Sequence, residues 1–375
     1  MGTTSTSRTD ATAGVPDDVA ALLGADQLAW WNLPRAFHRP EVWQVVVDGV
    51  LTAVALTSGR PTTAYRKVVD VWTAPHAGTP HDDAQHAGTG LAALLDAVVA
   101  DAAERGLAGV KVEVHPWSAW LADAPELAAA GFEALRDPIA SSAGTLGGVR
   151  GFVRWLDPWP HPELTYYGQT TDFTCGAVAG LAALERAGLT TLTGAAADET
   201  EAVEMALWRA ATNFPACEPL GLVVATTERL RAAGRTAQPE VFLSTDQPVM
   251  LDLGGGDAAG LRAMLQRQSL ERAVQLGIPV HRSWLPLDGV EDHLAEGSGL
   301  LLLIDDVHMV DDPTPHWVFA HAVHGRHVLI QDPWTDVDAG ETWVDGHELP
   351  LSLDDLDTMT RYGEPEYRGV IVVPA

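Results

Sequence analysis

A cysteine at the expected start of an apolar helix limits the possible folds of this chain more than any other feature. Cys175 is followed by small and apolar residues at helical spacing, and Gly188 is a candidate C-cap. Asp172 and Thr174 precede it as candidate N-caps, which places the cysteine in the first turn. There the unpaired amides and the helix dipole favour the thiolate over the thiol. The pattern predicts either a reactive thiol or a small buried cysteine that begins a core helix.

Gln169 and Cys217 bear on which of these interpretations holds. Gln169 lies six residues before Cys175, and its side-chain amide is a candidate donor to an oxyanion that develops beside the sulfur. Cys217, the second cysteine of the chain, is the rival nucleophile. It lies in a loop with no helix start and no glutamine at a similar spacing, so a structural role is favoured for it. Without a CxxC spacing we expect neither a disulfide framework nor a metal site.

The acidic composition excludes two classes of partner. The chain has 51 Asp and Glu against 23 Lys and Arg, for a net charge of -28. Nucleic acids and anionic membrane surfaces are bound by clustered Lys and Arg, which this sequence lacks. A partner of basic or neutral character fits better. The N-terminus has no apolar signal core, and the longest apolar run, residues 300–304, is too short to span a bilayer. We therefore expect a cytoplasmic protein.

The length of 375 residues, 46% of them hydrophobic, is enough for two domains with full cores. We expect a disordered tail over residues 1–14, a first domain over 15–156 and a second over 157–375. In the first domain an Asp48-Gly49 turn between apolar runs predicts a hairpin. The elements expected there are strands over residues 42–47, 50–56, 65–72, 108–114 and 148–155, and a helix over 91–105.

A glycine-rich segment precedes that helix. Glycines allow close approach of the backbone to a ligand, and free amides at a helix start attract anions. The segment is therefore a candidate pyrophosphate cradle, made of Gln85, His86, Ala87, Gly88, Thr89 and Gly90.

The same segment carries a resemblance to a known superfamily. Gln85, Gly88 and Gly90 match the Q/R-x-x-G-x-G/A element of the GNAT acetyltransferases, in that superfamily's order of hairpin, strand, loop, helix and strand. Gly131-Phe132 is similar to the end of its second helix, and the resemblance covers residues 40–156. It implies that the amides of residues 85–90 hold the pantetheine and pyrophosphate of acetyl-CoA. No glutamate is carried over as general base.

A second hairpin is predicted by two β-rich runs in the second domain, residues 316–323 and 327–332. A turn centred on His324 places His316 opposite Asp332, with Cβ atoms about 5 Å apart. At that separation the carboxylate can orient the imidazole. An oriented imidazole is a competent general base for a nearby thiol.

Three other histidines are alternatives to His316 as the base. His321 falls on the opposite face of the strand, and His324 and His327 lie at the turn, where exposed histidines are common. The other elements expected in this half are strands over residues 249–253 and 300–304, and helices over 206–213 and 261–276.

Gln169, Cys175, His316 and Asp332 occur in the chain order of papain-like cysteine peptidases. More narrowly, Gln169-(x)5-Cys175-Gly-Ala and His316-Trp-Val…Asp332-Pro resemble the bacteriocin-processing, double-glycine leader peptidase family over residues 160–375. The resemblance implies an oxyanion donor, a nucleophile, a base and an orienting acid at these four positions. It is not extended to leader-peptide cleavage.

Together these features predict an α/β protein, with a GNAT-like mixed sheet and helices followed by a papain-like cysteine-peptidase domain. The first functional hypothesis is hydrolysis or acyl transfer at an amide or peptide bond, with a peptide or a small amide or amine as substrate. The alternative is an N-acetyltransferase that uses acetyl-CoA and whose second domain recognises the target. A third possibility is a binding protein in which neither domain is catalytic.

Overall fold

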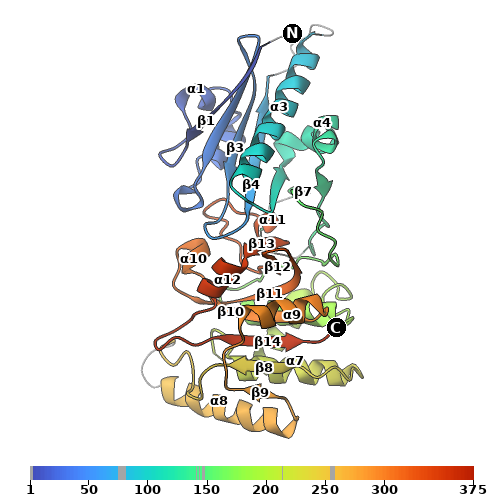
Figure 1. Cartoon of the computed structure of the whole chain (residues 1–375), viewed down its shortest axis with the longest axis vertical. Helices are drawn as coiled ribbons and strands as arrows, with labels where there is room; N and C mark the ends of the chain where they lie inside the picture. Colours follow the sequence, from blue (N-terminus) through green and yellow to red (C-terminus); the bar gives the residue numbers. More distant parts are fainter. Residues whose placement is uncertain are drawn as a thin grey trace. The chain divides into compact units, whose positions relative to one another are not determined.

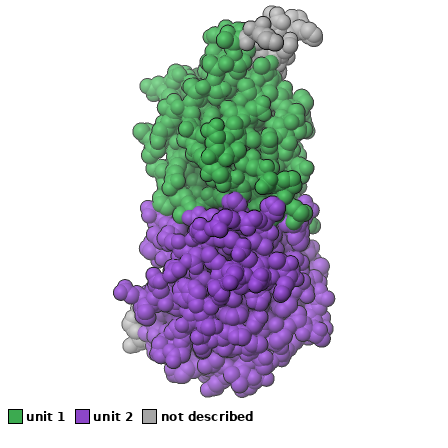
Figure 2. Space-filling view, in the orientation of Figure 1, with its two compact units in different colours: residues 1–137, 145–160, 336–345 green, residues 138–144, 161–335, 346–375 purple. Residues whose placement is uncertain are grey.

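The computed structural model describes residues 3–74, 82–140, 142, 144, 145, 148–212, 214–253 and 258–375; in the helix that begins at Asp82, side chains are described from Gly88 on. The chain is an α/β protein with two mixed sheets, as the sequence predicts (Figure 1). It divides into two compact units (Figure 2). The first unit comprises residues 1–137, 145–160 and 336–345, and the second comprises 138–144, 161–335 and 346–375.

The first unit is built on a seven-stranded sheet whose spatial order is β1 (Thr4–Asp10), β2 (Glu41–Val47), β3 (Val50–Ser58), β4 (Tyr65–Thr73), β5 (Gly109–Val114), β7 (Arg150–Trp155) and β6 (Glu133–Ala134). Neighbouring strands are antiparallel except β4 and β5, which are parallel. Its helices are α1 (Asp17–Ala20), α2 (Ala25–Trp31), η1 (Ala36–His38), α3 (Asp82–Glu104), η2 (Pro116–Asp123) and α4 (Pro125–Ala129).

Two features of the first unit correct expectations from the sequence. Residues 1–14 were expected as a disordered tail, but β1 pairs with β2 from Thr4 to Asp10. All of its residues are exposed and polar, so no apolar alternation marks it as a strand. Helix α3 begins at Asp82 instead of residue 91, so the glycine-rich segment is helical.

Residues 336–345 join the first unit from far along the sequence. Oδ1 of Asp345 accepts a hydrogen bond of 2.6 Å from the Tyr65 hydroxyl, and the other carboxylate oxygen pairs with Lys67. Lys67 also donates to Glu113 at 2.7 Å. All four side chains are buried. The sequence predicts one domain boundary, between residues 156 and 157, but the first unit also includes residues 336–345. This short segment supplies charged side chains to the core of the first unit.

The second unit also has a seven-stranded sheet, in the order β13 (Leu349–Ser352), β12 (His327–Gln331), β11 (Pro315–His324), β10 (Gly299–Asp305), β14 (Gly369–Val373), β8 (Glu240–Leu243) and β9 (Val280–His281). Only the β8–β9 pair is parallel. The helices are α5 (Cys175–Arg186), α6 (Thr200–Ala211), α7 (Pro219–Ala232), α8 (Ala258–Gln275), α9 (Leu287–Ala295), α10 (Val307–Val310), α11 (Trp343–Gly346), which straddles the two units, and α12 (Leu353–Met359).

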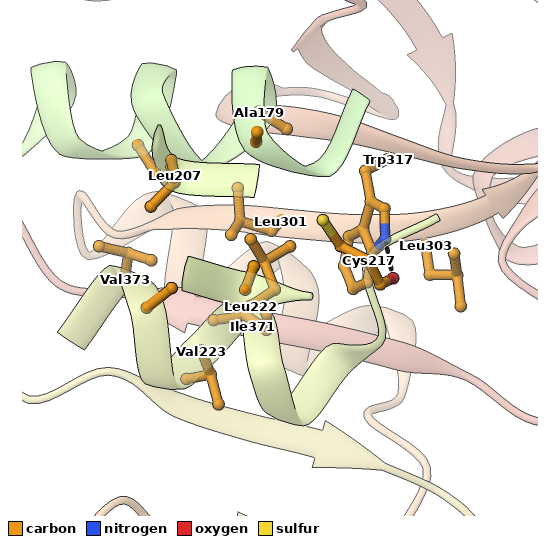
Figure 3. Packing of buried hydrophobic residues seen from close by; sticks show 14 of the residues in the cluster. Ala179, Leu207, Cys217, Leu222, Val223, Leu301, Leu303, Trp317, Ile371 and Val373 are labelled. Carbon is orange, nitrogen blue, oxygen red and sulfur yellow. Dashed lines mark hydrogen bonds between the residues drawn. The ribbon is translucent and has the colours of Figure 1, made fainter. Parts of the chain in front are cut away.

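The core of the second unit fixes the start of α5 beside the sheet. Alternate residues of β10, Leu301 and Leu303, face the same cluster as Trp317 of β11 and Ile371 of β14 (Figure 3). Successive residues of a strand point to opposite faces, and the intervening Leu300 and Leu302 are buried as well, so both faces of β10 are covered. Ala179 of α5 packs into the cluster, so burial of the helix holds its first turn in place.

The strand expected over residues 249–253 is not formed. Gln266 of α8 instead accepts a hydrogen bond from the Val249 amide at 2.9 Å and donates to its carbonyl at 2.7 Å. Because a side chain satisfies this backbone, the apolar segment is buried without a partner strand. Across the described ranges, no helix combines the length and the hydropathy needed to cross a bilayer.

Candidate functional site

Cys175 lies in the first turn of a helix, as predicted, and is the first residue of α5. Thr174 occupies the N-cap position, but its hydroxyl makes no cap bond to the helix amides. That hydroxyl instead donates to Glu204. The first-turn amides beside the Cys175 sulfur are therefore not used by the N-cap side chain, which suits a position where negative charge develops.

Glu204 organises the loop that leads to Cys175. Its carboxylate accepts hydrogen bonds from the Tyr167 hydroxyl at 2.9 Å and from the amide and hydroxyl of Thr170 at 3.0 and 2.9 Å, in addition to that from Thr174. Glu204 is fully buried. The sequence analysis missed it. The available signal was an acidic residue at helical spacing from Leu207, on the buried face of α6.

His316 and Asp332 meet as the sequence predicts, with 2.7 Å between Nε2 and Oδ1. The register differs from the expected one. The hairpin turn lies after His324, which pairs with His327, and an irregularity between Ala320 and Ala322 shifts the ladder by one residue. The last pair of the ladder is Phe319 with Gln331, so the next residue, Asp332, lies across from Val318 and not from His316. Its side chain reaches His316 diagonally, because positions 316 and 318 are on the same face of β11. Diagonal neighbours on a sheet lie within reach of long side chains.

Two opposing effects set the pKa of the His316 imidazole: burial lowers it, and the charge of Asp332 is the largest effect that raises it. Burial by itself lowers the pKa of His316, whereas the charges of Asp332 and then Asp306 raise it. Hydrogen bonds with the Asp332 carboxylate and with the Cys175 thiol raise it further, so the pKa lies well above its usual value. Cys175, His316 and Asp332 are all buried, with exposed fractions of 3%, 4% and 0%.

Gln169 lies in the same part of the structure. Its amide N–H donates to the carbonyl of Pro333, the residue after Asp332, at 2.9 Å. Its side-chain Nε2 donates to the carbonyl of Thr171 at 2.8 Å, and its buried Oε1 has no partner. The side-chain amide carries two hydrogens and therefore keeps one for a further acceptor. The oxyanion role of Gln169 stays a prediction.

The rival cysteine lies beside the same helix start. A Cβ built on Gly176 lies 3.1 Å from the Sγ of Cys217, and the indole of Trp317 donates to the Cys217 carbonyl at 2.9 Å. Burial, and next the charges of Cys175 and Glu218, raise the pKa of Cys217 well above its usual value. A thiol held neutral in this way is a poor nucleophile. The geometry favours a packing role for it.

The alternative histidines do not share the site of Cys175. Burial lowers the pKa of His321 to about 3, and its ring stacks on Phe319. His324 and His327 face each other at the hairpin turn. His316, in contrast, bonds to the Asp332 carboxylate, and the Cys175 thiol is its further partner.

The glycine-rich segment does not fit the expected pyrophosphate cradle. Gly88 and Gly90 lie inside α3, where backbone amides are used in the helix. A Cβ built on Gly90 lies 2.4 Å from the Thr52 hydroxyl oxygen, so this glycine permits close packing on β3. Thr89 is also within the helix, while the side chains of Gln85, His86 and Ala87 lie outside the described residues. Among the described side chains, no group of three or more His, Cys, Asp or Glu could hold a metal ion.

Several solved acetyltransferases are similar to part of this chain. The ribosomal-protein-S18-alanine N-acetyltransferase from Escherichia coli has 16% identity and a TM-score of 0.27, with 45% of this chain and 100% of that chain covered. A Bacillus subtilis acetyltransferase in complex with CoA has 14% identity and a TM-score of 0.29, with 41% and 100% covered. Nourseothricin acetyltransferase has 22% identity and a TM-score of 0.24, with 32% of this chain and 66% of that chain covered.

No curated protein matches the sequence. The profile of the Peptidase_C39 like family, in contrast, matches residues 164–374, which is more than half of the chain. The matched range contains Gln169, Cys175, His316 and Asp332. The chain belongs to the Peptidase_C39 like family.

Proposed function

We propose that the second unit is a thiol-dependent hydrolase or acyl transferase that acts on an amide or peptide bond. The observation that carries this proposal is the arrangement around His316. One ring nitrogen, Nε2, bonds to Asp332 at 2.7 Å, and the thiol of Cys175 is a further hydrogen-bond partner of the same side chain. A nucleophile, a base and a group that orients the base are the minimum set for covalent acyl transfer.

The reaction begins with proton transfer from the Cys175 thiol to Nδ1 of His316, the ring nitrogen that Asp332 does not occupy. The raised pKa of His316 favours the resulting thiolate–imidazolium pair. The thiolate attacks the carbonyl carbon of the substrate, and the imidazolium returns its proton to the departing amine. A thioester on Cys175 remains, and water activated by His316 hydrolyses it. An amine in place of water gives acyl transfer.

The tetrahedral intermediate carries a negative oxygen that needs hydrogen-bond donors. The proposed donors are the backbone amide of Cys175, at the start of α5, and the remaining side-chain N–H of Gln169. The bond from the Gln169 amide to Pro333 supports this assignment, because it holds the glutamine close to the residue that follows Asp332.

Iodoacetamide labelling tests the reactive thiol directly. Samples are labelled between pH 5 and 9, and the modified peptides are identified by mass spectrometry. We expect Cys175 to be labelled well below pH 8 and Cys217 to stay unmodified in the folded protein. Labelling of Cys175 that is as slow as that of a free thiol at pH 6 would contradict the proposal. The Cys175→Ala variant, which removes only a sulfur atom, should lose all amide cleavage and keep its melting temperature within a few degrees.

Acetyl transfer by the first unit is not proposed as a second function. Binding of acetyl-CoA was expected to use free backbone amides at residues 85–90. Gly88 and Gly90 lie within helix α3, where the backbone amides are already hydrogen-bonded. We derive no step through acetyl-CoA.

A further inference from the structure

A cavity of about 470 Å³ opens in the second unit between two loops. One loop covers residues 245–252, and the other is the hairpin at residues 362–367. In the hairpin, the amides and carbonyls of Tyr362 and Tyr367 bond to each other in both directions, at 3.0 and 2.8 Å. The two tyrosine rings meet edge to face, with centroids 5.8 Å apart. The hairpin is therefore a braced wall of the cavity.

The sheet register places this cavity close to His316. Asp305 of β10 pairs with Pro315, the residue before His316. On the other side of β10 the ladder pairs Leu302 with Val370, and the charge of Asp305 helps to raise the pKa of Tyr362, so the hairpin at residues 362–367 lies near the Asp305 end of β10. Adjacent strands are about 4.8 Å apart, so two strand spacings, about 10 Å, separate the β14 side of β10 from the His316 end of β11.

A chain of contacts leads to the same cavity from Cys175. Cys217 lies against Gly176, the second residue of α5. The neighbour of Cys217, Ala216, accepts a hydrogen bond of 2.8 Å from Arg262, which also contacts the sulfur of Met250 at 3.6 Å. Met250 lines the cavity. Two separate sets of contacts, one through the sheet from His316 and one from the start of α5, therefore connect the proposed site with this cavity.

The lining combines apolar walls with acceptors for a cation. Pro248, Val249 and Met250 supply apolar surface, while Asp252 and Glu364 are exposed carboxylates at the opening. The pKa of Tyr362 is raised to about 12, first by burial and then by the charges of Asp252 and Asp305. Asp252 and Asp305 thus place negative charge near this pocket, and Arg262 opposes part of their effect.

Two further observations favour a cationic occupant. The hydroxyl of Tyr367 is buried at the cavity wall without a hydrogen-bond partner, in a residue that is 6% exposed. Such a group costs free energy until a ligand satisfies it. The guanidinium of Arg262, the cation at this side, donates to the carbonyls of Pro215 and Ala216 at 3.0 and 2.8 Å. Two of its N–H groups are thus engaged by backbone carbonyls.

We propose that this cavity binds a lysine or arginine side chain of a peptide substrate, three or four residues from the bond that Cys175 attacks. The inference rests on the proposed thiol function. The aliphatic stem of such a side chain packs on the apolar wall, and its charged head meets Asp252, Glu364 and the faces or hydroxyls of the two tyrosines. The spacing follows from the 10 Å estimate, because an extended chain advances about 3.3 Å per residue. The net charge of -28 favours the approach of a basic peptide as well.

The test uses peptidyl chloromethyl ketones of four residues, each with lysine or norleucine at one position and glycine or alanine elsewhere. The second-order rate of Cys175 alkylation is measured for every probe, with iodoacetamide in parallel. We expect the lysine probe to react roughly tenfold faster than its norleucine partner at one position, which is the scale of one or two partly exposed ion pairs with a cation–π contact. The preference should weaken as salt is raised.

Substitutions in the cavity lining test whether the cavity causes the preference for lysine over norleucine. Asp252→Asn with Glu364→Gln should reduce the lysine-to-norleucine ratio to below about threefold, and Tyr367→Phe should lower it without changing the norleucine rate. Glu271→Gln is the matched control, because Glu271 is an exposed carboxylate of α8 that does not line the cavity. It removes one negative charge outside the cavity, against two in the double variant, and should leave the ratio unchanged.

The outcomes separate the two proposals. If iodoacetamide does not label Cys175, the thiol function fails and the cavity proposal fails with it. If iodoacetamide labels Cys175 but lysine and norleucine probes react equally at every position, the cavity proposal alone is wrong. A ratio that falls as much in Glu271→Gln as in the double variant would also overturn it, since the preference would then be a general effect of net charge.

Discussion

Asp332 has two separate uses for one carboxylate oxygen. Its Oδ1 takes the hydrogen bond with His316 and also accepts the amide of Trp334 at 2.9 Å, which closes the turn after β12. Asn at this position keeps an acceptor for both. Ala keeps neither, so Asp332→Ala tests the orienting role most directly.

We expect Asp332→Ala to slow the alkylation and turnover of Cys175 by a factor of about ten to a thousand, or about 1.4 to 4 kcal/mol at the transition state. The imidazole of His316 loses both its fixed direction and the charge that raises its pKa. Single-turnover kinetics and thermal unfolding are measured on the same samples. Unchanged kinetics with a lowered melting temperature would assign Asp332 to the turn alone.

The raised pKa of His316 also makes the stability of the fold depend on pH. Its folded pKa lies above the unfolded value of about 6.5. The folded state therefore binds more protons in the interval between the two values, and the free energy of unfolding falls as pH rises through it. The contribution is fully present below about pH 6.5 and is lost above the folded pKa.

Urea unfolding of the wild type and of His316→Gln at several pH values measures this term. The advantage of the wild type over the variant should be largest near pH 6 and should shrink towards pH 9. A difference that stays constant over this range would mean that His316 is not protonated more readily in the folded state.

At the scale of elements, the loop before α5 depends on a carboxylate from another helix. Glu204 of α6 accepts hydrogen bonds from the hydroxyls of Tyr167 and Thr174 and from the backbone amide and the hydroxyl of Thr170. Charge-assisted bonds of this kind are stronger than neutral ones. We infer that this carboxylate holds the segment that presents Gln169 and Cys175.

We expect Glu204→Gln to lower the free energy of unfolding by about 2–3 kcal/mol. The NH2 group of the glutamine would replace one carboxylate oxygen and would face hydrogen-bond donors that it cannot accept from. Alkylation of Cys175 should slow as the loop loses its anchor. Glu201→Gln is the control on the same helix, because Glu201 is exposed. Equal small effects of the two substitutions, in urea unfolding and in labelling, would show that the loop does not rely on Glu204.

At the scale of the whole molecule, the first unit is incomplete without residues 336–345. Glu341 forms a bidentate pair with buried Arg60 at 2.6 and 2.7 Å, and Asp345 pairs with buried Lys67. The Lys111 ammonium donates to the carbonyl of Val344 at 2.7 Å. Removal of one partner from a buried ion pair leaves an uncompensated charge, which costs about 3–5 kcal/mol.

A fragment of residues 1–160 should therefore fail to fold, because Arg60 loses the Glu341 carboxylate and Lys111 loses the Val344 carbonyl. In the same fragment Lys67 loses Asp345 and keeps Glu113 of its two carboxylate partners. We expect no cooperative thermal transition and weak dispersion in its NMR spectrum. In the full chain, Asp345→Asn should lower the free energy of unfolding by about 3 kcal/mol, and Asp338→Asn, a nearby carboxylate outside these pairs, is the control. A fragment that unfolds cooperatively with the stability of the full chain would refute the requirement.

The sequence by itself determined the α/β class and most of the local elements. Apolar runs and turn signals mark β2 to β5, β10 and the hairpin of His316, and the helical spacing after Cys175 marks α5 with Cys175 in its first turn. These features depend on neighbours within a few residues, so the order of the sequence contains them. The meeting of His316 with Asp332 was also predictable, because a hairpin brings residues of one short segment together.

Only the tertiary structure decided which distant segments are partners. The polar residues of β1 become a strand because β2 offers an edge, and residues 336–345 join the first unit because buried Lys67 and Arg60 need carboxylates. The role of Glu204 and the cavity beside Tyr367 likewise depend on segments far apart in the chain. Such pairings are chosen by burial and by the satisfaction of charges, and neither quantity can be read from the spacing of residues along a sequence.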